Sequence, residues 1–355
     1  MLKNILKIIL LTVNIVVVIA MLIPAFSQYL SPAKCVFLSY FGLFFLPVVL
    51  VNLLFALFWI INTKWCFLIS FVSILLVYSN INASFSFFKQ KEEITVNNFK
   101  VLTYNVMLFN YYDKKTQILD YINHSDADVV CLQEFGWHRN SKNFLSKEKI
   151  ISSLKNYPYY YIYITLDKNN VTYGIATFSK FPIVHKQRID YESYFNSSIF
   201  SDIKIGNDTI RIFNNHLESN RLTKEDKEKL SAEMSSEIIS QTAQKLSVAV
   251  SLRARQAQLV SAEITKSPYP VIVCGDFNDI PVSYVYKKIR GNLQDTFIGS
   301  GKGMGLTYSD NLYRFRIDYI LLNENFTYYG YEIDKVKYSD HYPVFCNVAM
   351  KPDKN

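Results

Sequence analysis

The run Val271-Ile272-Val273-Cys274-Gly275-Asp276-Phe277-Asn278 decides how the second part of this chain folds. Its four leading apolar residues predict a buried strand, and the glycine predicts that the strand ends there with polar side chains. Side chains two positions apart share one side of an extended chain, so Asp276 and Asn278 can serve as a base for water and an amide that orients it. The alternative is a simple Asx turn after the strand.

Two further predicted strands end in a polar residue that suits a cation. Asn105 closes a strand predicted over residues 99–105, and Glu134 follows the apolar strand predicted over residues 129–133. The amide of Asn105 can hold a metal or a phosphate, and the carboxylate of Glu134 suits a hard cation such as Mg²⁺. Each has an ordinary alternative, a turn residue for Asn105 and a solvated strand end for Glu134.

Histidines follow at two later positions. His216 comes after a strand predicted over residues 209–214, and it can donate to a phosphoryl oxygen, protonate a leaving group, or be an ordinary structural histidine. Asp340 and His341 are adjacent, which indicates a tuned acid–base or metal site. Asp318 is a second acid, and if it is buried it can orient the imidazole of His341 and stabilise its cationic form.

Together these runs resemble the endonuclease/exonuclease/phosphatase superfamily, which has the DNase I-like fold, over residues 99–350. The resemblance implies a four-layered α/β sandwich, in which two packed β-sheets are flanked by helices. It also implies a phosphoesterase that uses Mg²⁺, or Mn²⁺ in its place, to cleave P–O bonds with water.

The resemblance also implies roles for particular residues. The implied metal-site residues are Glu134, Asn105 and Asp340. The implied catalytic residues are Asp276 and Asn278, which activate and orient water, His216 and His341, which donate to the phosphoryl oxygens, and Asp318, which supports His341.

The rest of the body alternates short strands with longer helical runs. Further strands are predicted over residues 159–163, 174–179, 199–205, 317–322 and 344–349, and helices over residues 114–124 and 224–266, the second with a break. The aromatic-rich run of residues 157–163 is interpreted as a strand with alternating faces. We interpret residues 220–251 as a solvated helical insertion, with a substrate-facing insertion as the alternative. The five cysteines show no metal-binding spacing, and we expect them to be buried structural thiols.

Residues 1–88 have a different composition, with no acidic residue and only Lys3, Lys7, Lys34 and Lys64 as basic ones. The formal net charge of +8 therefore divides into +4 here and +4 over the remaining 267 residues, which is weak support for nucleic-acid binding. Apolar stretches at about residues 5–23, 35–61 and 65–88 predict about three transmembrane helices, the third diluted by serine and asparagine. We expect Pro24 and Pro32 to bracket the first turn.

Two properties of this anchor remain open. The first stretch can also be a signal peptide, with Ala25-Phe26-Ser27 resembling a cleavage site, although we favour a retained helix. Three spans with the N-terminus inside would put Lys34 and the body on the extracytoplasmic side of an inner or plasma membrane, whereas two spans would leave the body in the cytoplasm. The helices carry no acid or histidine, so we expect a plain anchor whose removal leaves an active body from Lys89 onward.

Fold resemblance does not choose the substrate. A nuclease-like phosphodiesterase is the preferred hypothesis, and the alternatives are a sphingomyelinase-like lipid phosphodiesterase, an inositol-phosphate phosphatase and, remotely, a non-catalytic membrane scaffold. The expected partners are a phosphoester, from nucleic acid or a phospholipid head group, and the membrane. No protein partner is inferred.

Overall fold

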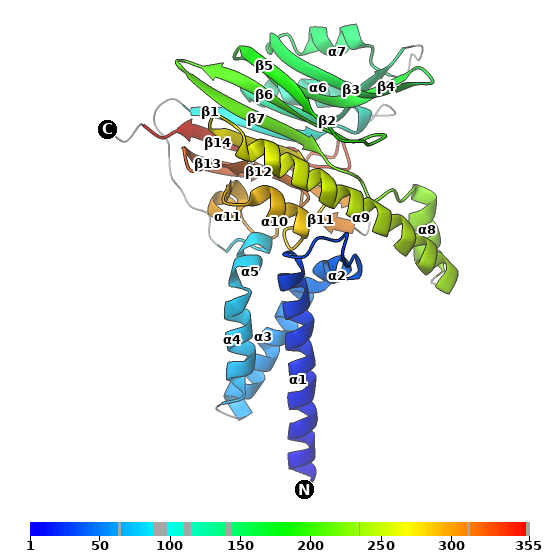
Figure 1. Cartoon of the computed structure of the whole chain (residues 1–355), viewed down its shortest axis with the longest axis vertical. Coiled ribbons are helices and arrows are strands. Elements are labelled where there is room, and N and C mark those ends of the chain that lie inside the picture. The colour runs from blue at the N-terminus through cyan, green and yellow to red at the C-terminus, as the bar shows by residue number, and fades with distance from the viewer. Residues whose placement is uncertain are drawn as a thin grey trace.

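A stalk of helices carries a β-rich body in the computed structural model (Figure 1). The structure describes residues 1–62, 65–87, 98–109, 115–139, 144–233, 235–310 and 313–352. The stalk contains α1 (Leu2–Ser27), α2 (Phe37–Tyr40), η1 (Phe41–Phe44), α3 (Phe45–Asn62), α4 (Phe67–Leu76) and α5 (Tyr78–Ser84).

Two six-stranded sheets form the centre of the body. The first has the order β13-β14-β1-β2-β4-β3, the second has the order β5-β6-β7-β8-β12-β9, and β10 and β11 form a separate pair. The strands are β1 (Asn98–Asn105), β2 (Val129–His138), β3 (Tyr159–Lys168), β4 (Val171–Ser179), β5 (Ile183–Ile189), β6 (Ser197–Ile205), β7 (Asp208–His216), β8 (Val271–Asp276), β9 (Gln294–Asp295), β10 (Tyr308–Asp310), β11 (Tyr313–Phe315), β12 (Asp318–Leu322), β13 (Phe326–Ile333) and β14 (Val344–Met350).

The burial of β8 on both faces explains why residues 271–274 are all apolar. Ile272 and Cys274 face the core between the two sheets, where they meet residues of the first sheet such as Val101. Val271 and Val273 face the opposite way, into a second core beneath the helices. A strand buried on both faces has no solvent side, so it needs no alternation of polar residues.

Helices cover the outer face of each sheet and complete four layers. They are α6 (Lys115–His124) and α7 (Lys147–Ser153) on the first sheet, and α9 (Ser236–Thr265) and α10 (Tyr284–Arg290) on the second. Ile118 and Ile150 pack against the first sheet, whereas Ala257 and Val285 pack against the second. The expected four-layered α/β sandwich is confirmed.

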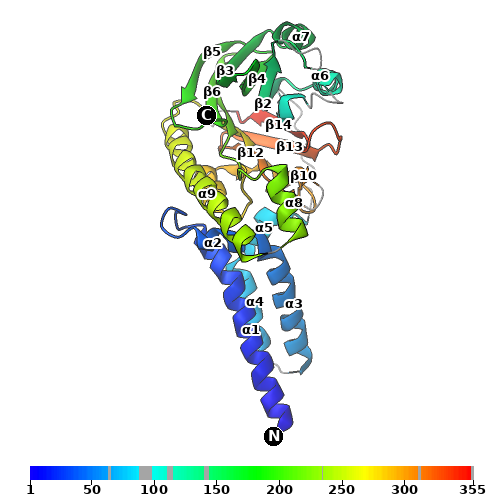
Figure 2. The same ribbon diagram turned by 90° about the vertical axis from the view of Figure 1, so that its right-hand side faces the viewer.

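The helical region predicted over residues 224–266 is broken, as expected. It forms α8 (Lys224–Ala232) and α9, whose N-termini are capped by the hydroxyls of Thr223 and Ser235. Figure 2 shows α8 and the first half of α9 extending from the body toward the stalk. Most of the described side chains there are exposed, which agrees with a solvated insertion.

The sequence patterns did not predict several helices and strands, because these elements are short or lack a clear alternation of apolar and polar residues. They are β5, β9, β10, β11, β13, η2 (Met107–Phe109), α7, α10 and α11 (Thr296–Ser300). β5 illustrates the reason, since six of its seven positions are at least partly exposed along the edge of the second sheet and its Lys and Arg residues obscure the pattern.

The stalk contains two helices that are long and apolar enough to cross a membrane, Leu2–Ser27 and Phe37–Asn62. The third predicted stretch forms α4 and α5, which are bent by 63° at Val77 and reach three crossings only if the pair counts as one span. Pro24 does not end the first helix, contrary to expectation, because α1 continues through it to Ser27. Proline lacks the amide proton that would bond to the carbonyl four residues earlier, so α1 continues past Pro24 without that one hydrogen bond.

A buried polar cluster joins the three stalk helices. Asn14 on α1 donates to Asn52 on α3 at 3.3 Å and to Ser70 on α4 at 2.8 Å, and it accepts from the indole of Trp59 at 2.9 Å. Asn52 donates in turn to Ser73 on α4 at 2.9 Å. The serines that dilute the third stretch therefore face the other helices, a common use of small polar residues in membrane bundles.

The body also packs directly on the end of the stalk. Buried Arg316 donates to the carbonyl of Ala83 at 2.7 Å, and Ser86 forms an isolated antiparallel bridge with Gly303. Val282 of the body joins the stalk's apolar cluster. The stalk is therefore more than an anchor attached through a linker.

The cysteines divide by location. Cys131, Cys274 and Cys346 are buried in the body, as expected. Cys35 is exposed and Cys66 is partly exposed, so the expectation of burial is wrong for these two, which lie in loops of the stalk.

Candidate active site

Three site residues meet because of strand register in the second sheet. β7 runs parallel to β8 with His216 opposite Asp276, and β12 runs antiparallel to β8 with Asp318 opposite the same residue. Asp276, the last residue of β8, therefore lies between a histidine and a second acid. All three are at most 2% exposed.

The first sheet adds Asn105, the last residue of β1, and Glu134, which lies inside the neighbouring parallel strand β2 rather than after it as predicted. The amide of Asn105 donates to Oε1 of Glu134 at 3.3 Å and to Oδ2 of Asp276 at 3.1 Å, which ties the two sheets together at the site. Glu134 lies in a bulge of β2 between Leu132 and Phe135 and has a φ of 50°. The bulge changes the direction of the side chain at a functional position, as bulges often do.

His341, which precedes β14, completes the centre. Its Nδ1 lies 2.9 Å from Oδ2 of Asp318, and its Nε2 lies 3.6 Å from Oδ2 of Asp276. Thr307 holds Asp318 in place, because its hydroxyl oxygen accepts from the amides of Ile317 and Asp318, both at 3.1 Å.

Burial and neighbouring charges separate the protonation states of the two histidines. Burial opposes a charge on His341, but Asp318 and Asp276 outweigh it and raise the pKa of the imidazole well above its usual value. Burial lowers the pKa of His216 to about 4, so His216 is neutral at pH 7. The site thus offers one cationic and one neutral imidazole.

Burial also acts on the carboxylates. It raises the pKa of Asp276, and together with the charge of Asp340 it raises the pKa of Glu134 to about 7. The side chain of Glu134 is 29% exposed and is therefore accessible to a solute. Acids that raise one another's pKa form a site that a cation would stabilise.

Two of the predicted residues lie differently from the others. The chain turns after Asp276, so the predicted extended chain from Asp276 to Asn278 does not form. Asn278 has a φ of 52°, its amide proton is donated to Oδ1 of Asp276 at 2.8 Å, and its side chain donates to the carbonyl of Leu217 at 2.9 Å. Asp340 is half-buried and accepts from the hydroxyl of Ser339 at 3.2 Å, and its charge raises the pKa of both Glu134 and His341.

Sequence reasoning missed Tyr173 and Thr307. Tyr173, inside β4, has its ring 6.5 Å from that of His216, and burial and the charge of Glu134 raise its pKa well above the usual value. Thr307 lies in a loop 11 positions before Asp318. Neither residue stands at a strand end with a recognisable motif, so no local signal marks it.

The donor set fits a hard divalent cation. Glu134, Asn105 and Asp340 offer only oxygen ligands, which Mg²⁺ prefers. Ligand atoms of Asp276, Asp318 and His341 also lie within 4.8 Å of one another, but the Asp318–His341 hydrogen bond already uses two of them. Nε2 of His216 is buried and, among the described residues, has no hydrogen-bond partner, which leaves it available to a bound solute.

This fold and this set of acids, histidines and amides define a hydrolase of the DNase I-like class. A family profile described as "Endonuclease/Exonuclease/phosphatase family" matches residues 102–341, and the chain belongs to that family, whose members hydrolyse phosphoester bonds. A second profile, described as "Domain of unknown function (DUF8431)", matches residues 6–84.

Solved structures agree on the fold at low identity. An endonuclease/exonuclease/phosphatase from Beutenbergia cavernae is 15% identical with a TM-score of 0.51, the match covering 72% of each chain. The human Nocturnin catalytic domain with bound sulfate is 18% identical with a TM-score of 0.50, covering 72% of this chain and 94% of that one. A family protein from Bacteroides thetaiotaomicron is 15% identical with a TM-score of 0.50, covering 73% and 100%. A search of curated proteins gave no match.

Proposed function

We propose that this chain is a divalent-metal-dependent phosphodiesterase held in a membrane by its stalk. The observation that carries the proposal is the position of Asp276. It receives a hydrogen bond from Asn105 and lies within 3.9 Å of both histidines, while Glu134 stands beside it and stays partly open to solvent. A base, a cationic donor and an open carboxylate thus face one point.

Glu134, Asn105 and Asp340 would hold Mg²⁺, or Mn²⁺ in its place. When bound, the ion supplies neutralisation of the negative charge that builds on the phosphoryl oxygens. This assignment also gives a reason for the crowding of acids that raises the pKa of Glu134.

Each of the other site residues has its own role in the reaction. Asp276 accepts the proton of the attacking water, and its raised pKa makes it a stronger base than an exposed aspartate. Cationic His341 donates to a phosphoryl oxygen, and Asp318 keeps it charged. His216 is neutral, so it acts as a hydrogen-bond donor rather than as the acid for the leaving group. Asn278 supports the turn that orients Asp276. This role differs from the one that the resemblance implied, in which Asn278 orients the attacking water itself.

The test uses the full-length chain in detergent with bis(p-nitrophenyl) phosphate as substrate. We expect Asp276→Asn or His341→Ala to lower turnover by about 10² or more, the usual loss for an acid–base group. Asp208→Asn is the matched control, because Asp208 is exposed at the other end of β7. Near wild-type rates in folded Asp276→Asn would refute the proposed mechanism.

We also propose that the stalk crosses the membrane three times. Figure 1 supports this, because α1 runs toward the body, α3 runs away from it and α4 returns. An odd number of crossings puts the body opposite the N-terminus, and Lys3 and Lys7 favour an N-terminus inside. A reporter that is active only outside the cytoplasm, fused after residue 352, should therefore be active. Activity of a cytoplasmic reporter alone would indicate two crossings.

A further inference from the structure

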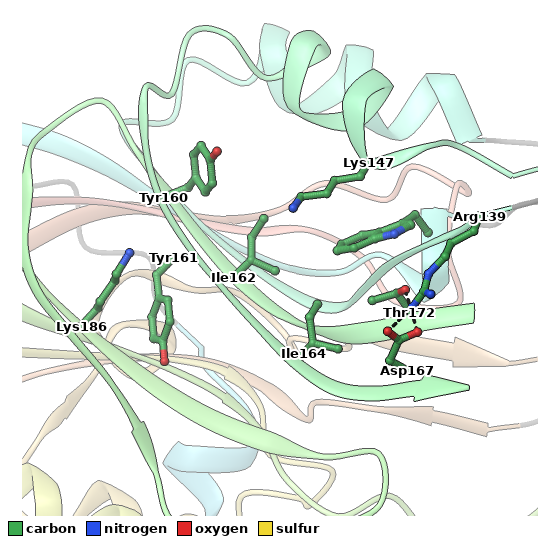
Figure 3. A pocket seen from close by; sticks show the side chains of 10 residues that line it. Arg139, Lys147, Tyr160, Tyr161, Ile162, Ile164, Asp167, Thr172 and Lys186 are labelled. Atoms are coloured by element: carbon green, nitrogen blue, oxygen red, sulfur yellow. Dashed lines mark hydrogen bonds and ion pairs between the residues drawn. The ribbon is translucent and has the colours of Figure 1, made fainter. Parts of the chain in front are cut away.

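A groove follows the seam between the two edge strands of the body. β3 ends the first sheet and β5 ends the second, and the two strands contact each other along the side of the sandwich. A hollow of about 380 Å³ wraps around the edge of β3. In Figure 3, Tyr160 and Tyr161 lie on opposite sides of β3, and Lys147 and Lys186 reach toward the strand.

Aromatic and cationic side chains face each other in two short rows. Alternation along β3 puts Tyr161 and Tyr163 on the side that faces β5, and alternation along β5 presents Lys186 and Arg188 to them. Nζ of Lys186 lies 5.5 Å from the centre of the Tyr161 ring, and the Arg188 guanidinium lies 5.0 Å from that of Tyr163. The seam thus combines flat π-surfaces with positive charge.

The groove continues to the candidate active site. A second hollow, of about 460 Å³, shares Tyr163 and Arg188 with these rows and extends to Ser193 and Tyr194. Beyond it the Phe195 ring lies 6.0 Å from that of Tyr173, the residue that neighbours His216. The second hollow therefore lies on the side of the seam that leads toward the catalytic centre.

The charge of the two hollows favours an anionic occupant. Four cations line them, Arg139, Lys147, Lys186 and Arg188, against the two carboxylates of Asp167 and Glu192. Arg139 is paired with Asp167, and Arg188 lies 3.8 Å from the carboxylate of Asp190. Lys147 and Lys186 are exposed, and within the described ranges neither forms an ion pair.

We propose that this groove binds single-stranded nucleic acid and leads it to the active site, an inference that rests on the proposed phosphodiesterase function. Bases stack on tyrosine faces without regard to sequence, while lysine and arginine neutralise the phosphates. The strands β3 and β5, whose residues line the groove, lie at the end of the body farthest from the stalk (Figure 1), so a lipid of the membrane that holds the stalk would not reach it.

The test measures binding of full-length chain in detergent to a fluorescent oligothymidylate of about 16 nucleotides, by anisotropy in EDTA so that no cleavage occurs. We expect Tyr163→Ala to weaken binding about tenfold and Tyr163→Phe to preserve it, because stacking requires the ring and not the hydroxyl. Lys186→Gln should reduce the slope of log K against log salt by about 0.7, the loss of one single-strand phosphate contact.

Lys288→Gln is the matched control, since Lys288 is exposed on α10 near the stalk. It should bind the oligonucleotide as wild type does. Lys288→Gln should also hydrolyse bis(p-nitrophenyl) phosphate as wild type does, because Lys288 lines neither hollow and lies outside the candidate active site. If the wild type hydrolyses no diester yet the groove variants lose oligonucleotide binding, the catalytic proposal fails and the groove stands.

Three results would overturn the inference. The first is wild-type oligonucleotide affinity in both Tyr163→Ala and Lys186→Gln. The second is equal affinity for a duplex of the same length. The third is binding to phosphatidylglycerol vesicles that is stronger than binding to the oligonucleotide and is lost in the same variants, which would assign the groove to a lipid surface.

Discussion

His341 and Asp318 are joined by a hydrogen bond of 2.9 Å although 23 positions separate them in the chain. The bond forms because β12 starts at Asp318 beside the end of β8, and the loop that precedes β14 brings the imidazole to the same point. One acid thus serves to charge and orient a histidine while a second acid, Asp276, faces that histidine's other nitrogen.

Replacing Asp318 should change the pH profile of the enzyme. His341 acts as a cation, so the rate holds below its pKa and falls as the pH rises through it. The charge of Asp318 raises that pKa, and Asp318→Asn should therefore move the fall to lower pH and reduce turnover by about 10² at pH 8. The measurement is the rate of diester hydrolysis against pH. An unchanged alkaline limb in a folded variant would show that Asp318 does not set the charge of His341.

Removing the metal should abolish turnover in a reversible way. We expect EDTA to stop diester hydrolysis and Mg²⁺ or Mn²⁺ to restore it, and Glu134→Gln to raise the Mg²⁺ concentration needed for half-maximal rate by tenfold or more. Calorimetric titration with Mg²⁺ gives a second readout that does not depend on activity. If Glu134→Gln binds Mg²⁺ as wild type does, another residue holds the ion. Asp208→Asn again serves as the control.

Gly275 should not tolerate a side chain. Its φ is 126°, and a Cβ there would lie 2.0 Å from the backbone oxygen of Asn215 on β7, which cannot move without separating the two strands. We expect Gly275→Ala to lower the free energy of unfolding by about 2 kcal/mol or more. Gly206→Ala is the control, because Gly206 also has a positive φ but has open space around it. Equal losses in chemical denaturation would mean that backbone strain alone explains the effect.

The stalk's last helix should contribute to the stability of the body. A chain beginning at Lys89 loses the Ala83 carbonyl that accepts from buried Arg316, and an unsatisfied buried donor costs about 1–3 kcal/mol. We expect its Tm to fall by about 3 °C or more. A chain beginning at Tyr78 retains Ala83 and Ser86 and should keep the Tm of the full-length body. Equal Tm values for the two truncations would restore the idea of a plain anchor.

The sequence predicted individual strands because their signals are local, whereas the sandwich was implied by the family resemblance. A continuous apolar run such as 271–274 identifies a strand covered on both faces, and polar residues at strand ends identify the edge where a site can form. Strand register then brings His216, Asp276 and Asp318 together, which the linear motifs alone indicate only through family resemblance.

Other features depend on contacts between distant segments and were not predictable. The direction of Asn278 is set by a positive φ and by the carbonyl of Leu217, 61 positions away. Arg316 reaches Ala83 across 233 positions. Pro24 was expected to end its helix, but an apolar helix tolerates proline in its last turn when neighbouring helices pack around it.

The contacts of Arg316 with Ala83 and of Ser86 with Gly303 fasten the body to the stalk at two points. Two contacts prevent the rotation of the body relative to the stalk that a single flexible linker would allow. If the stalk crosses a bilayer as proposed, the catalytic centre keeps one height and one tilt above the surface, and it moves only by lateral diffusion and by spinning about the membrane normal. The enzyme would then sample a thin slab of solution, and its turnover would follow the amount of substrate that enters that slab.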